Sequence, residues 1–386
     1  ATPGHVRALA KTELAAVLCQ QSVRENTRTG RSPRQVLDDA VWGAWQSGWR
    51  RGFGADADHL KTTDEIEAFV NAGYTFFTLD PGDYMDRGAD NASSVHLVAQ
   101  VAALPWEVLQ STADDLFFGL TRRPLELDGF TVQLTRESVL RSAAKYGRVI
   151  AHTLTMVRHL QKKMAPKPFD IEVSVDETDS ATTLAEHIYI AAELSRLGVI
   201  VNSLAPRYVG DFEKGVDYIG DIAAFEVSFA RHAAVARAFG NYKMSLHSGS
   251  DKFAIYPSIF SHTKGLLHIK TAGTSYLEAL RTVAQKNPSL FREILKFSLT
   301  RYADDRASYH VSAKIEKVPC VSRLPDVSLP EVLDDFHSRE VLHVTYGSVL
   351  ANPVMQKGLF DALRANEAYY RDNLEHHFGR HFALLE

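Results

Sequence analysis

The sequence predicts an α/β protein folded as a (β/α)8 barrel, a TIM barrel, and three observations support this fold. Short apolar segments typical of buried strands alternate with longer helical segments along most of the chain. Eight such segments occur, near residues 52, 75, 131, 171, 200, 244, 267 and 310. Polar residues follow several of them directly, as they do at the rim of a barrel where strands end. The third and eighth segments are the weakest; without either, an open sheet with a helical subdomain is the alternative.

Composition and charge exclude several classes of protein. The 386 residues are 45% apolar and 23% charged, and the formal net charge of -4 argues against a nucleic-acid binder. Two distant cysteines, Cys19 and Cys320, suggest neither a disulfide framework nor a cysteine zinc site. No apolar run approaches the roughly 20 residues of a membrane span, and no signal peptide is visible. We therefore expect one cytoplasmic domain over residues 1–386 without nucleic-acid or membrane partners, and a homo-oligomer remains open.

The beginning of the chain is expected to be helical and then to enter the barrel. Residues 1–48 form a helical N-terminal segment in this interpretation. After the first strand, Thr62 and Glu65 have the spacing of a capping box at a helix start. The strand Gly73–Asp80 completes a βαβ unit, the building block of a parallel sheet.

The alternation is interrupted once and then continues to the end of the barrel. Its loss over about residues 84–167 predicts a helical insertion around one barrel strand, and residues 354–386 predict a C-terminal helix. Ser275 and Glu278 suggest a second capping box. The remaining expected elements are the strand Phe130–Leu134, the strand Phe169–Asp176, a helix Leu184–Leu197 capped by Thr183, the strand Val199–Leu204, a helix Gly220–Phe239, the strands Tyr242–Leu246 and Leu266–Ile269, a helix starting near Pro288, and a last strand Ser308–Ser312.

The densest polar clusters follow the two strands Tyr242–Leu246 and Leu266–Ile269. The first runs into His247-Ser-Gly-Ser-Asp-Lys252, and the second carries His268, Lys270 and Thr271. Solvated turns with hydrogen-bonded core histidines are the alternative, but this density on two adjacent strands favours a site. The substrate contacts predicted here are Ser248, Ser250, Asp251, Lys252, Thr271 and Thr274.

A divalent metal such as zinc or manganese is the expected cofactor. Metal ligation needs three convergent side chains from different strands and an open position for substrate. The residues His59, His247 and His268 meet this requirement, since they come from the first, sixth and seventh expected strands. His310 is the reserve ligand. The other twelve histidines, including His376-His377, are expected at the surface.

Carboxylates near these histidines are the expected proton carriers. Asp58 precedes His59, and both can reach one site if the strand ends there. Glu172, Ser174 and Asp176 alternate with apolar residues, which predicts a polar barrel interior. The predicted catalytic residues are Asp58, Asp176, Glu177 and Lys270.

Several basic and acidic side chains are expected to bind substrate. Arg207, after the fifth strand, can pair with a carboxylate, and Lys214 can support it. Lys61 and Asp80 are further contacts. The alternatives are an Asp-Pro-Gly turn for Asp80 and a surface ion pair for Lys214.

The segment Gly52–Ala57 matches a dinucleotide fingerprint only weakly. A pyrophosphate needs a helix N-terminus beside the second glycine, whereas this loop carries Asp56 and Asp58. We therefore expect no bound NAD.

Six strings between about Gly52 and Pro319 together resemble the tagaturonate epimerase (hexuronate epimerase) family. They are GFGADADHLKT, VDETDSATT, FEKGVDYIGD, SLHSGSDKFAIYP, HIKTAGTSYLEALR and YHVSA. The resemblance implies a metal-dependent TIM-barrel enzyme that interconverts D-tagaturonate and D-fructuronate in bacterial hexuronate breakdown, with a small sugar acid as its partner. More distantly, Asp58-His59 and His247-Ser-Gly-Ser250 are similar to the Asp-His and His-Gly-Gly-Ser elements of class II aldolases. In those enzymes the histidines bind zinc and the Asp moves protons; the single Gly249 puts a phosphate-binding role in doubt.

The implied reaction suits retro-aldol chemistry. The inverted carbon is β to the ketone, so its hydrogen is not acidified, and breaking and re-forming a carbon–carbon bond can invert it. Such a route uses a Lewis acid, a carboxylate that carries the hydroxyl proton, and cations for the substrate acid, here Arg207, Lys252 and Lys270. Two rivals remain: a class II-type aldolase acting on a sugar acid, and a non-catalytic sugar-acid-binding protein.

Overall fold

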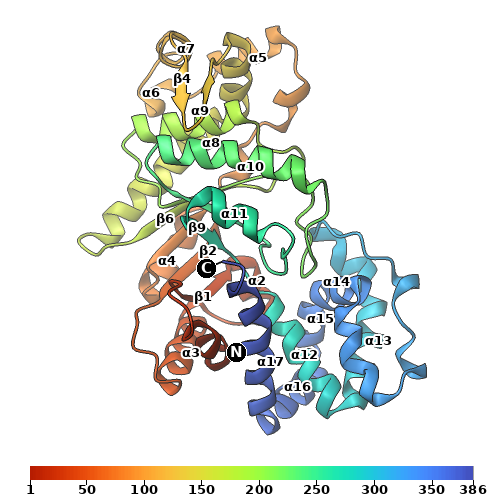
Figure 1. Ribbon diagram of the computed structural model, residues 1–386. Coiled ribbons are helices and arrows are strands. Elements are labelled where there is room, and N and C mark those ends of the chain that lie inside the picture. The colour runs from red at the N-terminus through yellow and green to blue at the C-terminus, as the bar shows by residue number, and fades with distance from the viewer. Residues whose placement is uncertain (386) are drawn as a thin grey trace.

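The computed structural model describes residues 1–385, and a seven-stranded parallel sheet lies at its centre (Figure 1). Neighbouring strands follow the order of the chain, β1-β2-β3-β6-β7-β8-β9, and every pair is parallel. Consecutive crossovers of this kind curl a sheet toward a barrel. The strands are β1 (Val17–Ser22), β2 (Gly54–Leu60), β3 (Phe76–Leu79), β6 (Asp170–Val175), β7 (Ser203–Pro206), β8 (Lys243–Leu246) and β9 (Leu267–Ile269).

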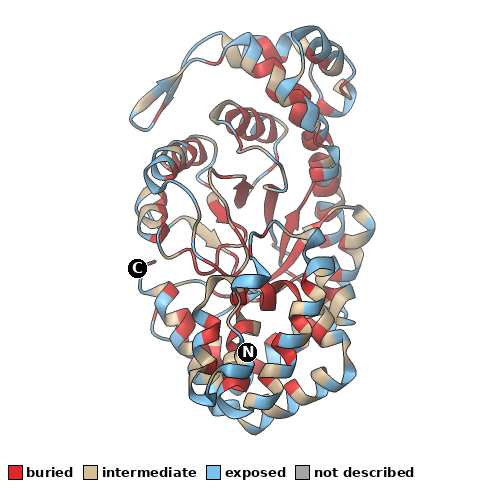
Figure 2. Cartoon of the chain, turned by 90° about the vertical axis from the view of Figure 1, so that its right-hand side faces the viewer, coloured by how far each residue is buried: buried red, intermediate tan, exposed pale blue. Residues whose placement is uncertain are grey.

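Side-chain alternation gives the sheet an apolar outer face and a polar inner face. On β6, Ile171 and Val173 belong to the apolar core, whereas Glu172 and Ser174 are buried polar residues of the other face. This confirms the predicted polar interior. The strands are buried in the middle of the molecule with helices around them (Figure 2). The connecting helices are α2 (Val23–Thr29), α3 (Pro33–Gln46), α4 (Thr63–Ala72), α8 (Arg136–Met164), α9 (Leu184–Arg196), α10 (Ile222–Ala238) and α11 (Tyr256–Thr263).

Local signals place several helix starts as predicted. Thr62 with Glu65 and Thr183 with Glu186 form capping boxes, and Pro288 occupies the first turn of its helix. The predicted box at Ser275 is wrong. α12 (Thr274–Lys286) begins two residues earlier than that box requires: its N-cap is Gly273, and no side chain caps it.

The sheet is open, so the complete eight-stranded barrel is not formed. Six predicted strands are present in the sheet. Within residues 1–385, no strand joins β9 to β1. The predicted last strand, Ser308–Ser312, is wrong: its end is held by side chains, because Glu213 and Glu340 accept the backbone N–H of Ser312. The helical prediction for residues 1–48 misses β1, whose central Cys19 is buried in the core.

The predicted third strand belongs to a hairpin in the insertion. β5 (Phe130–Val132) pairs antiparallel with β4 (Leu125–Leu127) and not with the main sheet. Asp128 and Gly129 form the two-residue loop between them, a sequence that favours tight hairpins. The insertion packs on α8 at the top of Figure 1. Its other elements are η1 (Gly82–Tyr84), η2 (Arg87–Asn91), α5 (Ser94–Ala102), α6 (Trp106–Leu109) and α7 (Ala113–Thr121).

Helices after β9 build a second hydrophobic core, drawn mainly in blue in Figure 1. The predicted single C-terminal helix is divided at Asn366, and its second half packs against α1 (Thr2–Leu9). The elements are α13 (Pro288–Asp305), η3 (Arg306–Ser308), η4 (Ile315–Lys317), η5 (Val321–Arg323), η6 (Asp326–Asp334), α14 (Phe336–Val344), α15 (Tyr346–Ala351), α16 (Pro353–Ala365) and α17 (Glu367–Phe382). None of the described helices has the length and apolar character needed to cross a bilayer.

Candidate active site

A buried lysine joins three carboxylates on the inner face of the sheet. Nζ of Lys270, just after β9, lies 2.5 Å from Oδ1 of Asp58, 2.9 Å from Oδ2 of Asp56 and 3.0 Å from Oε1 of Glu172. It also donates to Oγ1 of Thr78 at 2.7 Å. The curl of the sheet therefore brings the end of β9 over β2, β3 and β6. Burial lowers the pKa of Lys270, but the three carboxylates outweigh it and raise the pKa well above its ordinary value.

Glu172 connects this lysine to two histidines. Its Oε1 lies 2.6 Å from Nε2 of His247, and its Oε2 lies 2.9 Å from Nδ1 of His268. Burial raises the pKa of Glu172, but Lys270 and both histidines outweigh it and lower the pKa well below its usual range. Glu172 is therefore a carboxylate that orients two imidazole rings from neighbouring strands.

His59 reaches the same end of the sheet because β2 changes direction there. The backbone φ of His59 is 53°, in the left-handed region, and the pairing register with β3 shifts between Ala57 and Leu60. As a result Nε2 of His59 lies 3.9 Å from Oδ1 of Asp58, although adjacent strand residues normally point to opposite faces. Nδ1 lies 3.0 Å from Oδ2 of Asp80, which fixes the ring.

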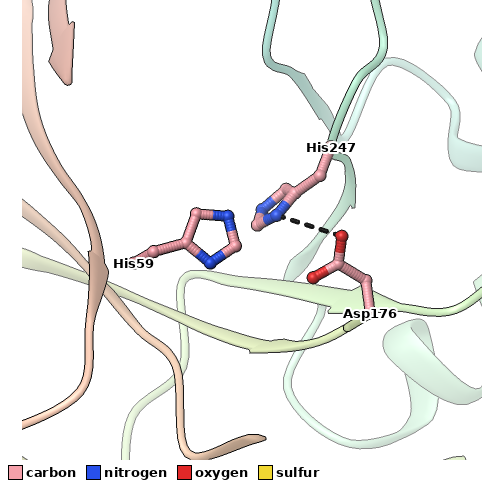
Figure 3. Close-up of side chains that lie close together, drawn as sticks. All are labelled: His59, Asp176 and His247. Carbon is pink, nitrogen blue, oxygen red and sulfur yellow. Dashed lines mark ion pairs between the residues drawn. The ribbon is translucent and has the colours of Figure 1, made fainter. Parts of the chain in front are cut away.

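His59, His247 and Asp176 form the candidate metal centre (Figure 3). One possible ligand atom from each lies within 4.8 Å of the others, and the two rings meet edge to face with centroids 4.8 Å apart. Nδ1 of His247 faces Oδ2 of Asp176 at 3.3 Å, yet this buried nitrogen makes no hydrogen bond. Two imidazoles and one carboxylate are a donor set that suits a divalent cation.

The electrostatics of this group also favour a cation. Burial lowers the pKa of His247, but Asp176 and Glu172 raise it to about 10 despite the opposing charge of Lys270. Burial raises the pKa of Asp176, but His247 and His59 outweigh it and hold the carboxyl ionised. The carboxylates thus stabilise positive charge at this position, whether it is carried by a proton or by a metal ion.

An open cavity lies beside this group. It is bordered by the ends of β1, β2, β8 and β9 and by the loop after β7. The arrangement therefore resembles the rim site of a parallel barrel, as predicted. The predicted residues that line the cavity are Asp58, His59, Lys214, His247, Ser248, Ser250, Lys270, Thr271 and Thr274.

His268 lies apart from the other two predicted ligands. Its Nδ1 is bonded to Glu172, its ring meets Phe76 edge to face, and it borders a second cavity at the opposite end of the sheet. Asp176, and not His268, lies beside His59 and His247 as the third possible ligand. The reserve ligand His310 is 71% exposed and pairs with Asp211, because the expected strand around it does not form.

Three predicted substrate contacts have structural partners. Nζ of Lys252 is buried and donates to the carbonyl groups of Glu213, Val216 and Ser250. Arg207 pairs with Asp211, and Asp251 pairs with Arg339. These three side chains hold loops in place and do not line the cavity.

The remaining predicted residues, Asp80, Lys61 and Glu177, lie next to the candidate metal centre and not in the cavity. Asp80 holds the His59 ring, and Lys61 lies 3.1 Å from Asp83 and 3.9 Å from both Asp80 and Glu177. The side chain of Glu177 is 40% exposed. Lys61 and Glu177 therefore belong to the rim.

Histidines expected at the surface are buried near the site. His381 lies 3.0 Å from the backbone nitrogen of Asp251, and His377 lies 3.1 Å from Oγ1 of Thr274. His343, on α14, lines the cavity. One feature of the sequence could have indicated their burial: His377 and His381 are spaced i, i+4, so they lie on one face of α17.

Fold and site together define an α/β enzyme whose polar centre lies at the carboxyl ends of a curled parallel sheet. Comparison with known proteins agrees. The family model UxaE, described as tagaturonate epimerase, matches residues 1–385. The tagaturonate/fructuronate epimerase of Thermotoga maritima is 43% identical over 385 residues, which cover 100% of this chain and 78% of the relative.

Solved structures give the same result. The native crystal structure of fructuronate-tagaturonate epimerase UxaE from Cohnella laeviribosi superposes with a TM-score of 0.93 at 34% identity, over 100% of this chain and 79% of that one. A glycerol complex of the same enzyme superposes with a TM-score of 0.93 at 33% identity, over 100% and 78% of the two chains. The chain belongs to the tagaturonate epimerase family and is an isomerase-class enzyme.

Proposed function

We propose that this protein interconverts D-tagaturonate and D-fructuronate with the help of a divalent cation, by retro-aldol cleavage and re-addition. The observation that carries the proposal is the approach of His59, Asp176 and His247 beside the Lys270–Asp58 ion pair, in a chain of this family. Both sugar acids named for the Thermotoga maritima relative differ only at the carbon β to the ketone.

His59, Asp176 and His247 are the residues that would hold the cation. Nδ1 of His247, which faces Asp176 without a hydrogen bond, and the ionised Asp176 support this assignment. A divalent ion bound there supplies Lewis acidity, which stabilises negative charge on the oxygens of the ketone side. The outer partners Asp80 and Glu172 orient the two imidazoles through hydrogen bonds, as second carboxylates do in many metal sites.

Asp58 is the proposed proton carrier. Burial raises its pKa, but Lys270, His59 and His247 outweigh burial and keep the carboxyl ionised. Asp58 accepts the proton of the substrate hydroxyl on the β carbon while the bond between the α and β carbons breaks. The electron pair of that bond moves to the ketone and gives an enediolate, and the β carbon becomes an aldehyde. The aldehyde then rotates and presents its other face to the enediolate. The bond re-forms with the β carbon inverted, and Asp58 returns the proton to the new hydroxyl.

Lys214 replaces Arg207 and Lys252 as the proposed contact for the substrate acid. It lines the cavity, and within residues 1–385 its ammonium group has neither a hydrogen bond nor an ion pair. Burial lowers its pKa, opposed by Asp176 and Asp58. A carboxylate entering the cavity would provide the missing partner.

Isotopes and fragments test the mechanism. In heavy water the epimer should carry no deuterium at the inverted carbon, and carbon-13 effects should appear at both carbons of the breaking bond. Deuterium there would favour proton abstraction, and retention without a carbon effect would favour hydride transfer. Net release of two fragments would identify an aldolase.

Variants test the residues. Asp58→Asn should keep the fold and lose about 10²–10⁴-fold in kcat. Asp176→Asn should weaken metal affinity by at least roughly 10–100-fold, the loss seen for partners behind metal ligands, and so lower metal content after dialysis. Asp170→Asn, an exposed position at the other end of β6, is the matched control. Unchanged metal content in Asp176→Asn would remove Asp176 from the centre.

A further inference from the structure

His343 enters the active-site cavity from outside the sheet. It belongs to α14, whose neighbours Val341, Leu342 and Val344 lie in the second hydrophobic core. The side chain is 8% exposed and lines the cavity that contains Lys214. A helix after the sheet thus completes a wall of the site.

Two glycines make room for the imidazole ring. A Cβ atom on Gly273 would lie 2.1 Å from Nε2 of His343, and a Cβ on Gly215 would lie 3.2 Å from Cδ2. Gly215 follows β7 and Gly273 follows β9, so the ring is wedged between two loops of the rim. Gly273 has φ of -69°, which any residue can adopt, so its backbone does not require glycine. The close approach of His343 does.

The ring nitrogens have no partner. Nδ1 is buried without a hydrogen bond, and no hydrogen bond to Nε2 occurs within the described part of the chain. A buried polar group without a partner is costly and needs an explanation, and a ligand absent from the structure is one. The catalytic cycle proposed above does not use this side chain.

The charges around His343 indicate which ligand it meets. Burial, together with the nearby cations Lys214 and Arg339 and against the opposing Asp251, lowers the pKa of its ring to about 3. The ring is therefore neutral, with one N–H to donate, in surroundings that are mainly positive. An anion is the ligand that satisfies both the ring N–H and the unpaired ammonium group of Lys214.

We propose that His343 is a substrate-binding residue that, together with Lys214, recognises the carboxylate end of the sugar acid. In this arrangement Nε2–H donates to one carboxylate oxygen. The proposal rests on the proposed function of the site. It adds a specificity role for the helices after the sheet.

Calorimetric titration with D-gluconate, a six-carbon hydroxy acid, tests the proposal directly. Removing a hydrogen bond to a charged group should weaken gluconate binding by roughly 10–100-fold in His343→Ala. KM of the epimerase reaction should rise by a similar factor, with a smaller change in kcat. His343→Gln, which keeps an amide N–H near the position of Nε2, should recover most of the affinity. His376→Ala, on the exposed face of α17, is the control.

Gly273→Ala provides an independent test, because the three heavy atoms nearest to its methyl group all belong to His343. This variant should weaken gluconate binding as His343→Ala does. The double variant should bind gluconate as weakly as His343→Ala alone, and no more weakly. Thermal melting of each variant establishes that the fold is intact.

The outcomes separate this proposal from the proposed function. If the wild type epimerises and binds gluconate but His343→Ala does both equally well, the role of His343 is overturned. Additive losses in the double variant would also overturn it. A wild type that binds gluconate without epimerising contradicts the proposed function alone, and a wild type that does neither contradicts both.

Discussion

Replacing Lys270 by methionine should reveal how strongly the buried network contributes to stability. The substitution removes one ammonium group but leaves Asp56, Asp58 and Glu172 buried on the inner face. Removing one partner of a buried ion pair typically costs about 3–5 kcal/mol, because a charge remains without compensation. His247 and His268 still compensate Glu172, so we expect a loss near the lower end, about 3 kcal/mol.

The loss of stability in Lys270→Met is reduced because Asp56 can take up a proton, and Asp56 also provides a second variant. Burial raises its pKa, opposed by Lys270, and the net shift is upward. Asp56 therefore takes up a proton more readily than the other two carboxyls. Asp56→Asn alone should change stability little. Combined with Lys270→Met, it should recover part of the loss, since one fewer acidic group lacks its cation.

The dependence on pH has a definite sign. Asp58 and Glu172 have folded-state pKa values below their unfolded values, so the stability they contribute is present above about pH 4 and is lost as the pH falls. Lys270→Met raises both values. Urea unfolding should therefore show a larger difference between variant and wild type at pH 7.5 than at pH 3.5, where these carboxyls begin to take up protons. A difference below about 1 kcal/mol at pH 7.5, the scale of a surface ion pair, would refute the reasoning.

Two further predictions concern other charged groups. Burial and a hydrogen bond with Glu213 raise the pKa of Glu340 to about 9, so the stability it contributes is complete below its unfolded value of about 4.5 and is lost as the pH rises toward 9. Glu340→Gln should therefore flatten the fall in melting temperature between pH 6 and 9, and an unchanged slope would argue against it. Lys214→Met should raise KM roughly 10–100-fold with a smaller effect on kcat; an unchanged KM would return the acid-binding role to Arg207.

Periodic and local signals made much of the fold predictable. The strands that alternate apolar and polar residues, such as Asp170–Val175, were predicted within a few residues, and so were the helices that begin with Thr62 and Thr183. These features depend only on neighbouring residues. The closure of the sheet depends instead on long-range pairing, and the segment Ser308–Ser312 satisfies its backbone with Glu213 and Glu340. No local pattern of that segment indicates those partners.

The candidate site was predictable where its residues follow strands directly. Asp58, His59, His247 and Lys270 were found in this way, and the structure brings them to one cavity. His343 could not be found, because it lies on a helix of a different core, 70 or more residues beyond the last strand of the sheet. Its approach to the loops depends on tertiary packing.

Glu172 was recognised only as part of an alternating pattern, yet it is the residue that joins the two halves of the site. Its Oε1 contacts both Lys270 and His247, and Ser203 donates to its Oε2 at 2.6 Å. An apolar interior would be as stable or more stable, so the buried charged network here is best explained by preorganisation of the site.

Glu172→Gln tests this interpretation, because it keeps the shape of the side chain and removes its charge. His247 loses one of the two carboxylates that stabilise its positive charge, and Lys270 loses one of three. We expect kcat/KM to fall about 10–100-fold, the loss typical of residues that orient the histidines of a metal site, if the proposed cation binds here. Ser203→Ala removes only a hydrogen bond to the same carboxylate and should cost much less. Equal losses in the two variants would mean that packing around Glu172, and not its charge, positions the histidine and the lysine.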